Sequence, residues 1–180
     1  GKHERCGTFE LRGPEVELDI AIARRETYAH PGALPSIEPA TLAEDLERRD
    51  FRVNALALPL CGREDSSSAQ VEAVAGALGD LREKRLVVLH GRSFHDDPTR
   101  ALRAARLCPR LGFKLERGSR SALSDAMRDG AFGGVSGDRF RREFEKLFSD
   151  STLGLNPAAA LRLLADWHVL GALEPGLELP

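Results

Sequence analysis

The sequence contains only three cysteines, Cys6, Cys61 and Cys108, and their spacing matches no common metal-binding pattern. An odd set of widely separated cysteines is typical of reduced thiols, so we expect a cytoplasmic protein. No apolar run approaches the roughly 20 residues that a membrane-spanning helix needs, and no signal peptide is visible. These absences argue against a membrane partner and against a disulfide-rich secreted domain.

Neither sign of charge dominates the composition. The 180 residues include 26 Lys and Arg against 28 Asp and Glu, a formal net charge of −2, so any contact with nucleic acid must come from a local basic patch. A chain of this length can form one sizeable domain or two small ones. The sequence shows no internal repeat and no low-complexity tract.

The segment from Ser93 to Phe113 supplies such a patch. Asp97 suits the N-cap of a helix and Pro98 the first helical position. Four arginines then recur every three or four residues opposite an apolar stripe, so they share one helix face. Gly112 is expected to end this helix, and Pro109 to bend it or end it early. The arginines are Arg100, Arg103, Arg106 and Arg110, and the stripe is Ala101, Ala104, Ala105, Cys108 and Leu111.

Two interpretations of this arginine face follow from the residues alone. Guanidinium groups suit phosphate oxygens and the acceptor edges of bases, and Asp97 would add a hydrogen-bond acceptor beside the donors. Such a combination could read the edge of a base with protein groups alone. The same pattern is equally consistent with a solvated, charged helix face.

Upstream of this helix, alternating polar and apolar residues over 6–23 predict a β-hairpin that turns at Gly13-Pro14. Asp19 falls in the middle of the second strand, on the face opposite the apolar side chains. Its carboxylate could be solvated surface, a salt-bridge partner or a metal ligand, and the residues alone favour the surface. Residues 24–40 hold three prolines and are predicted to form a loop.

The middle of the chain contains a strong helix signal. Thr41 and Glu44 form a capping box, which predicts a short helix ending near Arg48. The next segment, 49–58, is predicted to be a strand with one buried face. Within it Asn54 would need hydrogen-bond partners.

After residue 58 the sequence first contains a polar segment and then several segments with a helical pattern. Residues 62–70 are serine-rich and predict a surface excursion. Further helices are expected over 119–128, from Ser136 onward, and from Asn156-Pro157 to Gly171. The apolar side of the last helix is predicted to carry Leu161, Leu164, Ala165 and His168.

Three of these stretches together resemble the class II tRNA nucleotidyltransferases and bacterial poly(A) polymerases. Residues 45–57 (DLERRDFRVNALA) resemble that family's motif RRDFT-NALA, and residues 94–106 (FHDDPTRALRAAR) resemble its motif EDPLR-LRAARF. Residues 18–28 (LDIAIARRETY) resemble the strand that carries the family's third acidic residue. The motifs occur in the family's order and spacing, so the resemblance covers nearly the whole chain.

The resemblance implies an α+β fold. Residues 1–92 would form part of a polymerase β-type nucleotidyltransferase head, a mixed sheet with helices. Residues 93–150 would form an all-helical neck that recognises the nucleotide, and residues 151–180 the start of a helical body. The family transfers a nucleotide from CTP or ATP to an RNA 3′-hydroxyl with Mg²⁺, either at the CCA end of tRNA or in making poly(A).

The same resemblance implies roles for Asp97 and for four arginines. Asp97 and Arg100 would bond the base edge of CTP or ATP. Arg49, Arg103 and Arg106 would contact the triphosphate or the ribose. These roles suit phosphoryl transfer, which depends mostly on positioning and on neutralising charge.

Two further roles concern the acids and one amide. Asp50 and Asn54 would brace the site or the sugar, and Asp19 would be the third catalytic carboxylate, holding Mg²⁺ or orienting the attacking hydroxyl. The resemblance also expects Asp19 and the arginine face to line one common hollow.

One departure from the family bears on catalysis. The family's Gly-Gly turn and Asp-x-Asp pair do not occur, and Asp19 is the only aspartate before Asp45. Because two-metal catalysis needs carboxylates on both ions, we expect little or no transferase activity from these 180 residues alone, as from a fragment of a longer enzyme. Two alternatives stay open: a non-catalytic nucleotide- or RNA-binding module, and a structural remnant whose arginines pair with its own acids.

Overall fold

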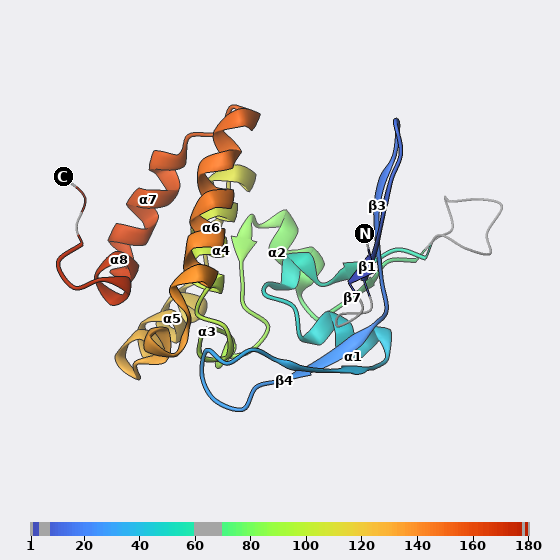
Figure 1. Cartoon of the computed structure of the whole chain (residues 1–180), viewed down its shortest axis with the longest axis horizontal. Helices are drawn as coiled ribbons and strands as arrows, with labels where there is room; N and C mark the ends of the chain where they lie inside the picture. Colours follow the sequence, from blue (N-terminus) through green and yellow to red (C-terminus); the bar gives the residue numbers. More distant parts are fainter. Residues whose placement is uncertain (1, 4–7, 60–69, 178, 180) are drawn as a thin grey trace.

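The computed structural model describes residues 2–3, 8–59, 70–177 and 179, and it has the predicted α+β composition (Figure 1). Its sheets are small. The antiparallel sheet β1-β2-β3 consists of Lys2–His3, Thr8–Arg12 and Glu17–Ala21. The two-stranded sheets are β4 (Arg24–Thr27) with β5 (Ser36–Pro39), β6 (Leu56–Ala57) with β7 (Glu72–Ala73), and the parallel pair β8 (Arg85–Leu86) and β9 (Lys114–Leu115).

The helices divide between the two ends of the molecule (Figure 1). Near the sheets lie α1 (Leu42–Glu47), the 3₁₀ helix η2 (Arg52–Asn54) and α2 (Ala77–Arg82). The other end is helical, and there α4 packs against α6 and α7. Its elements are α3 (Ser93–Asp96), α4 (Arg100–Leu111), α5 (Arg117–Arg128), η4 (Ala131–Gly134), α6 (Gly137–Ser149), η5 (Asp150–Leu153), α7 (Pro157–Asp166) and α8 (Val169–Leu173).

One hydrophobic core joins the two ends. Phe51 and Leu86, from the part rich in sheets, belong to the same buried cluster as Phe94, Leu102 and Leu123 from the helical part. The cluster therefore includes residues on both sides of position 92, where the sequence predicts a domain boundary. The position of that boundary stays a prediction.

The hairpin predicted over 6–23 is confirmed by β2 and β3, whose turn is closed by a 2.7 Å bond from the Gly13 N–H to the Val16 carbonyl. Phe9 pairs with Ile20 in register, yet both side chains are about half exposed, at 48% and 55%. The apolar face of this hairpin is thus not part of the described core.

The loop predicted over 24–40 is wrong, because β4 and β5 form an antiparallel ladder from Arg24↔Pro39 to Thr27↔Ser36. The prolines permit this ladder by their positions. Pro31 lies in the connecting turn, Pro35 precedes β5, and Pro39 is the last residue of the strand. At such positions a missing N–H removes no interior ladder bond.

The strand predicted over 49–58 is also wrong for most of its length. Only Leu56–Ala57 forms a ladder, and the turn of η2 interrupts the chain before it. Asp50 explains the interruption, because its Oδ1 accepts the Phe51 N–H at 2.9 Å and the Asn54 amide at 3.0 Å. Side-chain bonds to nearby backbone groups compete with strand pairing.

The arginine helix α4 differs from its prediction at its start. It begins at Arg100, and Asp97 follows α3 instead of capping α4 directly. The Asp97 carboxylate still accepts the Thr99 N–H at 3.0 Å, so it stabilises the turn that leads into the helix.

Pro109 does not end α4 early, and the bend predicted as the alternative stays a prediction. The helix continues to Leu111 and ends at Gly112 (φ +67°), as predicted for the glycine. The loss of one donor in the last turn does not end the helix because the Cys108 carbonyl still accepts the N–H groups of Gly112 and Phe113.

The single helix predicted over 157–171 is in fact two. His168 adopts a left-handed conformation (φ +62°) between α7 and α8, and its side chain is exposed instead of facing the core. Trp167, just before it, is buried and takes its place in the core. Of the excursion predicted over 62–70, only Gln70 lies among the described residues. Across the described residues, no helix combines the length and apolar character needed to cross a membrane.

The predicted capping box is confirmed and gives a stability test. The Thr41 hydroxyl accepts the Glu44 N–H, and the Glu44 carboxylate accepts the Thr41 N–H at 2.9 Å. Thr41→Ala is expected to lower the free energy of unfolding by about 1 kcal/mol in a urea titration. Thr152→Ala, which removes an exposed hydroxyl bonded to the Ser149 carbonyl, should change it by less than about 0.5 kcal/mol. Equal effects of the two variants would contradict the capping role.

Candidate functional site

A cavity of about 620 Å³ opens between the β4–β5 hairpin, the end of α1, the turn of η2 and the start of α4. Its volume lies in the range of pockets that hold small organic ligands. The lining is polar and includes five arginines and three acids. The lining residues are Arg24, Glu26, Tyr28, Pro35, Arg48, Arg49, Asp50, Asn54, Asp97, Arg100 and Arg103.

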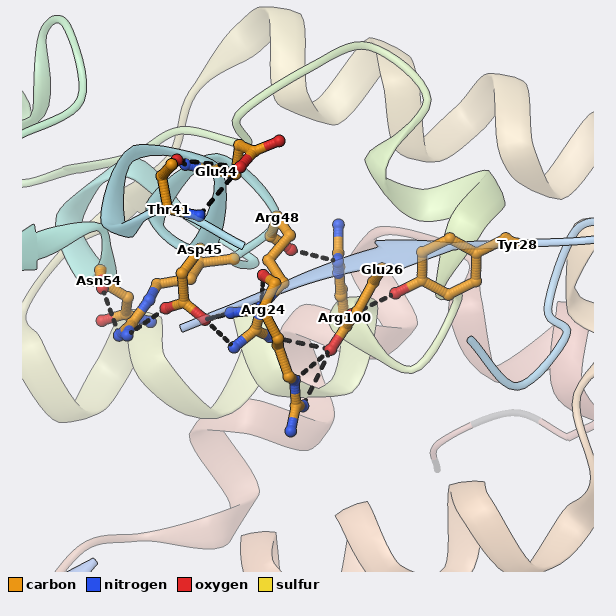
Figure 2. Close-up of polar contacts among 10 residues, drawn as sticks. Arg24, Glu26, Tyr28, Thr41, Glu44, Asp45, Arg48, Asn54 and Arg100 are labelled. Carbon is orange, nitrogen blue, oxygen red and sulfur yellow. Dashed lines mark hydrogen bonds and ion pairs between the residues drawn. The ribbon is translucent and has the colours of Figure 1, made fainter. Parts of the chain in front are cut away.

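Glu26 binds three other side chains of one wall of this cavity (Figure 2). Its side chain is only 8% exposed, and its Oε1 accepts Arg24 Nη2 and Arg48 Nη1, both at 2.9 Å. The Tyr28 hydroxyl donates to Oε2 at 2.9 Å. Burial, together with the nearby charge of Glu26, raises the pKa of Tyr28 above its ordinary value, so this hydroxyl stays a hydrogen-bond donor.

Asp45 does not line the cavity itself but binds two arginines of the same wall. Its carboxylate accepts Arg48 Nη2 at 2.6 Å, Arg49 Nη2 at 2.9 Å and the Arg24 N–H at 3.1 Å (Figure 2). Burial by itself would raise the pKa of Asp45, but the bonds from Arg48 and Arg49 outweigh it, and the pKa lies below its ordinary value. Asp45 therefore fixes the directions of two arginines that line the cavity.

Asp50 plays the corresponding part for Arg103. Its Oδ2 accepts a hydrogen bond from Arg103 Nε at 2.9 Å and forms an ion pair with Arg103 Nη2 at 2.6 Å, while Oδ1 accepts the Asn54 amide N–H. Burial would lower the pKa of Arg103, but the charge of Asp50 outweighs it and raises that pKa. The Arg103 side chain is still 44% exposed, so it can contact a ligand in the cavity.

Arg100 differs from the other arginines of the cavity in its burial and in its partners. It is 5% exposed, and its guanidinium donates to Ser93 Oγ at 2.6 Å and to the Arg48 carbonyl at 3.0 Å. Both partners are neutral oxygens, and within the described residues Arg100 forms no ion pair. A buried guanidinium without a carboxylate partner favours a ligand that brings acceptors into the cavity.

Asp97 lies beside Arg100 and is held by a residue that the sequence patterns did not single out. Within the described chain the hydrogen bonds of its carboxylate all involve Oδ1, which accepts Thr99 Oγ1 at 2.6 Å and Arg139 Nη2 at 2.9 Å. Arg139, on α6, also donates to the Gly32 carbonyl at 2.7 Å. It therefore ties the turn between β4 and β5 to Asp97, a contact across more than a hundred residues that no local pattern indicates.

The cavity gathers six of the eight residues that the sequence resemblance singles out: Arg49, Asp50, Asn54, Asp97, Arg100 and Arg103. Two others do not line it. Asp19 is exposed on β3, in register with Glu10, and Arg106 lies 3.3 Å from Asp150. The functions of all eight stay predictions.

Arg24, Glu26 and Arg48 also line the cavity, and sequence reasoning did not select them. Arg24 and Glu26 are two apart and so lie on one face of a strand, a signal that is lost when 24–40 is taken as a loop. Arg48 follows the helix that the capping box predicts, and it pairs with Asp45 on that helix and with Glu26 on β4.

The Mg²⁺ site implied by the resemblance is not matched by the described residues. No three side chains of His, Cys, Asp or Glu among them are placed to share a metal ion. Asp19 provides one carboxylate, and hard divalent cations need several oxygen ligands. The described part of the chain can therefore position a ligand by charge and hydrogen bonding, without a metal site of its own.

The chain is similar in sequence to known proteins over most of its length. Residues 1–87 match the family model of the poly(A) polymerase head domain. Over 96% of its length the chain is 38% identical to the A-adding tRNA nucleotidyltransferase of Aquifex aeolicus, of which it covers 24%. It is 39% identical, over 89% of its length, to the CC-adding tRNA nucleotidyltransferase of Deinococcus radiodurans, of which it covers 40%.

Solved structures extend the similarity to the fold. A CCA-adding enzyme in an apo form superposes with a TM-score of 0.85 at 34% identity, over 98% of this chain and 40% of that one. A tRNA nucleotidyltransferase complexed with a primer tRNA and an incoming ATP analog gives a TM-score of 0.81 at 33% identity, over 100% of this chain and 48% of that one. The chain thus spans less than half the length of each of these relatives.

Proposed function

This chain belongs to the family of tRNA nucleotidyltransferases and poly(A) polymerases, and on that basis we propose that its cavity binds the CTP or ATP that an RNA nucleotidyltransferase adds to an RNA 3′-hydroxyl. The observation that carries the proposal is the lining of the cavity, which contains five arginines and three acids. An excess of fixed positive charge in a polar cavity of this size suits a nucleoside triphosphate.

Asp97 and Arg100 would select the base. In both cytosine and adenine, an amino group that donates stands beside a ring nitrogen that accepts. A carboxylate beside a guanidinium presents the opposite pattern, an acceptor next to donors. Uracil and guanine would place a carbonyl against the carboxylate of Asp97, so the pair would reject them.

Arg49 and Arg103 would contact the triphosphate or the ribose. Their side chains are 40% and 44% exposed, so each keeps donors toward the cavity while one edge is held by Asp45 or Asp50. Asp50 and Asn54 would act by fixing the direction of Arg103 and the turn of η2. Holding both arginines in advance reduces the entropy lost when the ligand binds.

Nucleotide transfer itself would need more than the described residues provide. We assign the transfer of CMP or AMP to a longer protein, in which Mg²⁺ and further carboxylates join the contribution of Asp19. The RNA partner would be a tRNA or another RNA with a free 3′ end. The 180 residues alone would then bind the nucleotide without turning it over.

Two measurements on the 180-residue chain test this proposal. Calorimetric titration in the presence of EDTA is expected to show binding of CTP and ATP, with UTP and GTP bound at least about tenfold more weakly. Incubation with Mg²⁺, labelled CTP or ATP and a tRNA lacking its 3′ end is expected to give no labelled RNA. Equal affinity for all four nucleotides would contradict base selection by Asp97 and Arg100, absence of binding would favour a structural remnant, and sustained labelling would show that the chain is itself a transferase.

A further inference from the structure

A second, smaller cavity of about 210 Å³ lies where α4 and the end of α6 meet the start of α7. It is separate from the nucleotide cavity, and the two share no lining residue. Its lining includes Arg106, Arg110, Asp150 and Asn156 together with apolar side chains such as Leu147 and Leu155.

Two arginines of α4 converge on one acid in this cavity. Arg106 Nε is 3.3 Å from Asp150 Oδ2, and Arg110 Nη1 is 3.6 Å from Asp150 Oδ1. Neither contact is a hydrogen bond within the described structure, and Arg106 Nε is a buried atom without a hydrogen-bond partner there. The carboxylate therefore neutralises one of the two charges and leaves donors unsatisfied.

The surroundings strengthen the remaining positive charge. Apolar side chains form much of the wall, and a low-polarity wall screens charges less than water does. Helix α7, which is ten residues long, begins at this wall with Asn156 as its N-cap, so its positive end adds to that of the arginines. The cavity thus combines a net charge of one with two guanidinium groups that make no hydrogen bond to Asp150.

We propose that this cavity binds a backbone phosphate of the RNA substrate. A phosphodiester carries a single negative charge, which matches two guanidinium groups facing one carboxylate. A triphosphate carries more charge and would be expected at the five arginines of the larger cavity. From Arg103 to Arg110 the helix rises about 10 Å, so α4 would hold the nucleotide at one end and the RNA backbone further along.

This inference rests on the proposed function, since it names where the RNA of that reaction is held. It also changes the role of Arg106, which the sequence resemblance places at the triphosphate or ribose. On the present geometry Arg106 and Arg110 form an RNA contact, and Arg103 is the last arginine of α4 that reaches the nucleotide cavity.

The first test is Arg110→Ala, measured with a hairpin RNA that reproduces a tRNA acceptor stem without its last three nucleotides. The side chain of Arg110 is 40% exposed, so its removal should leave the fold intact. RNA binding is expected to weaken about five- to tenfold at low salt, and the plot of log K against log salt to become shallower by about 0.7 to 0.9. CTP binding should not change. Arg117→Ala, an exposed arginine at the start of α5, is the control and should leave both affinities unchanged.

The second variant, Asp150→Asn, is expected to act in the opposite direction. It removes the competing charge with little change of shape, so RNA should bind about two- to threefold more tightly. An ion-pair group with a purely structural role would lose stability in this variant without gaining RNA affinity, and that result would overturn the proposal.

The two binding assays separate this inference from the proposed function. Unchanged RNA binding by Arg110→Ala, or an equal loss of CTP and RNA binding, would overturn the phosphate site in the small cavity. If the unmodified chain failed to bind CTP but the Arg110 and Asp150 variants still shifted RNA affinity in opposite directions, the nucleotide proposal would fail and the RNA site would stand.

Discussion

Replacing Asp45 by asparagine is expected to lower the free energy of unfolding by about 3 kcal/mol, since removing one partner of a buried ion pair typically costs that much or more. The Asp45 side chain is 7% exposed and accepts bonds from Arg48, Arg49 and the Arg24 N–H. Asparagine keeps the shape but removes the one ion-pair partner that Arg49 has among the described residues, and it leaves Arg48 paired with Glu26 alone. Urea unfolding at neutral pH measures the loss.

A matched control is Glu38→Gln, which removes an acid from an exposed ion pair with Arg25. Because both members of that pair are solvated, the change should be below about 1 kcal/mol. A similar small change in Asp45→Asn would mean that the buried carboxylate does not hold this wall of the cavity together.

Lowering the pH should remove the stabilisation that the ionised Asp45 gives to the folded state. The pKa of Asp45 is lowered in the folded chain, because the bonds from Arg48 and Arg49 outweigh the effect of burial. A lowered carboxylate pKa stabilises the folded state above the unfolded-state value of about 4, and this gain is lost as the pH falls through the folded-state pKa. The difference in stability between the unmodified chain and Asp45→Asn should therefore shrink below about pH 4. A difference that stays constant down to pH 2 would contradict an ionic origin.

Arg100→Gln is expected to reduce the affinity for CTP and ATP about a hundredfold. Hydrogen bonds to charged groups contribute up to about 3 kcal/mol each, and each 1.4 kcal/mol corresponds to a factor of ten. Arg100 is buried at the wall of the cavity and has no carboxylate partner among the described residues, so a bound base would be its main polar ligand. Calorimetric titration of both nucleotides measures the effect.

Glutamine can still donate to Ser93 or to the Arg48 carbonyl, so the variant should remain folded, with a modest loss of stability that thermal unfolding would record. Arg92→Gln changes an exposed arginine outside the cavity lining and should bind CTP and ATP as the unmodified chain does. A folded Arg100→Gln variant that kept its affinity within about threefold would exclude Arg100 from base recognition.

Local signals in the sequence predict local structure well. The capping box of Thr41 and Glu44 specifies α1 because its bonds join residues three apart, and Gly112 ends α4 because it adopts a left-handed conformation at no steric cost. The prolines of 24–40 mislead because their effect depends on where they fall relative to a turn, which composition does not reveal. Asp50 misleads in the same way, since its side chain competes with the strand that the apolar pattern predicts.

The residues of the candidate site also fall into those that local sequence signals predict and those that they do not. The two long motifs contain most of the residues that line the cavity, because residues close in sequence stay close together around the end of α1, the turn of η2 and the start of α4. Glu26 and Arg139 lie outside these motifs, and they act through partners 22 and 42 residues away in sequence. Such contacts come from the fold, and a single sequence contains no periodicity that encodes them.

The hydrophobic core described above also limits how this protein can be recombined with its relatives. Phe51, Leu86 and Phe94 share one cluster, so a chimera joined near residue 92 would bring together two halves of a core that were never selected to fit. The connection between β3 and β4 is a better exchange point, because β2 and β3 contribute no residue to the described cluster. Grafting a different first hairpin there would leave the cavity and the packing beneath it unchanged.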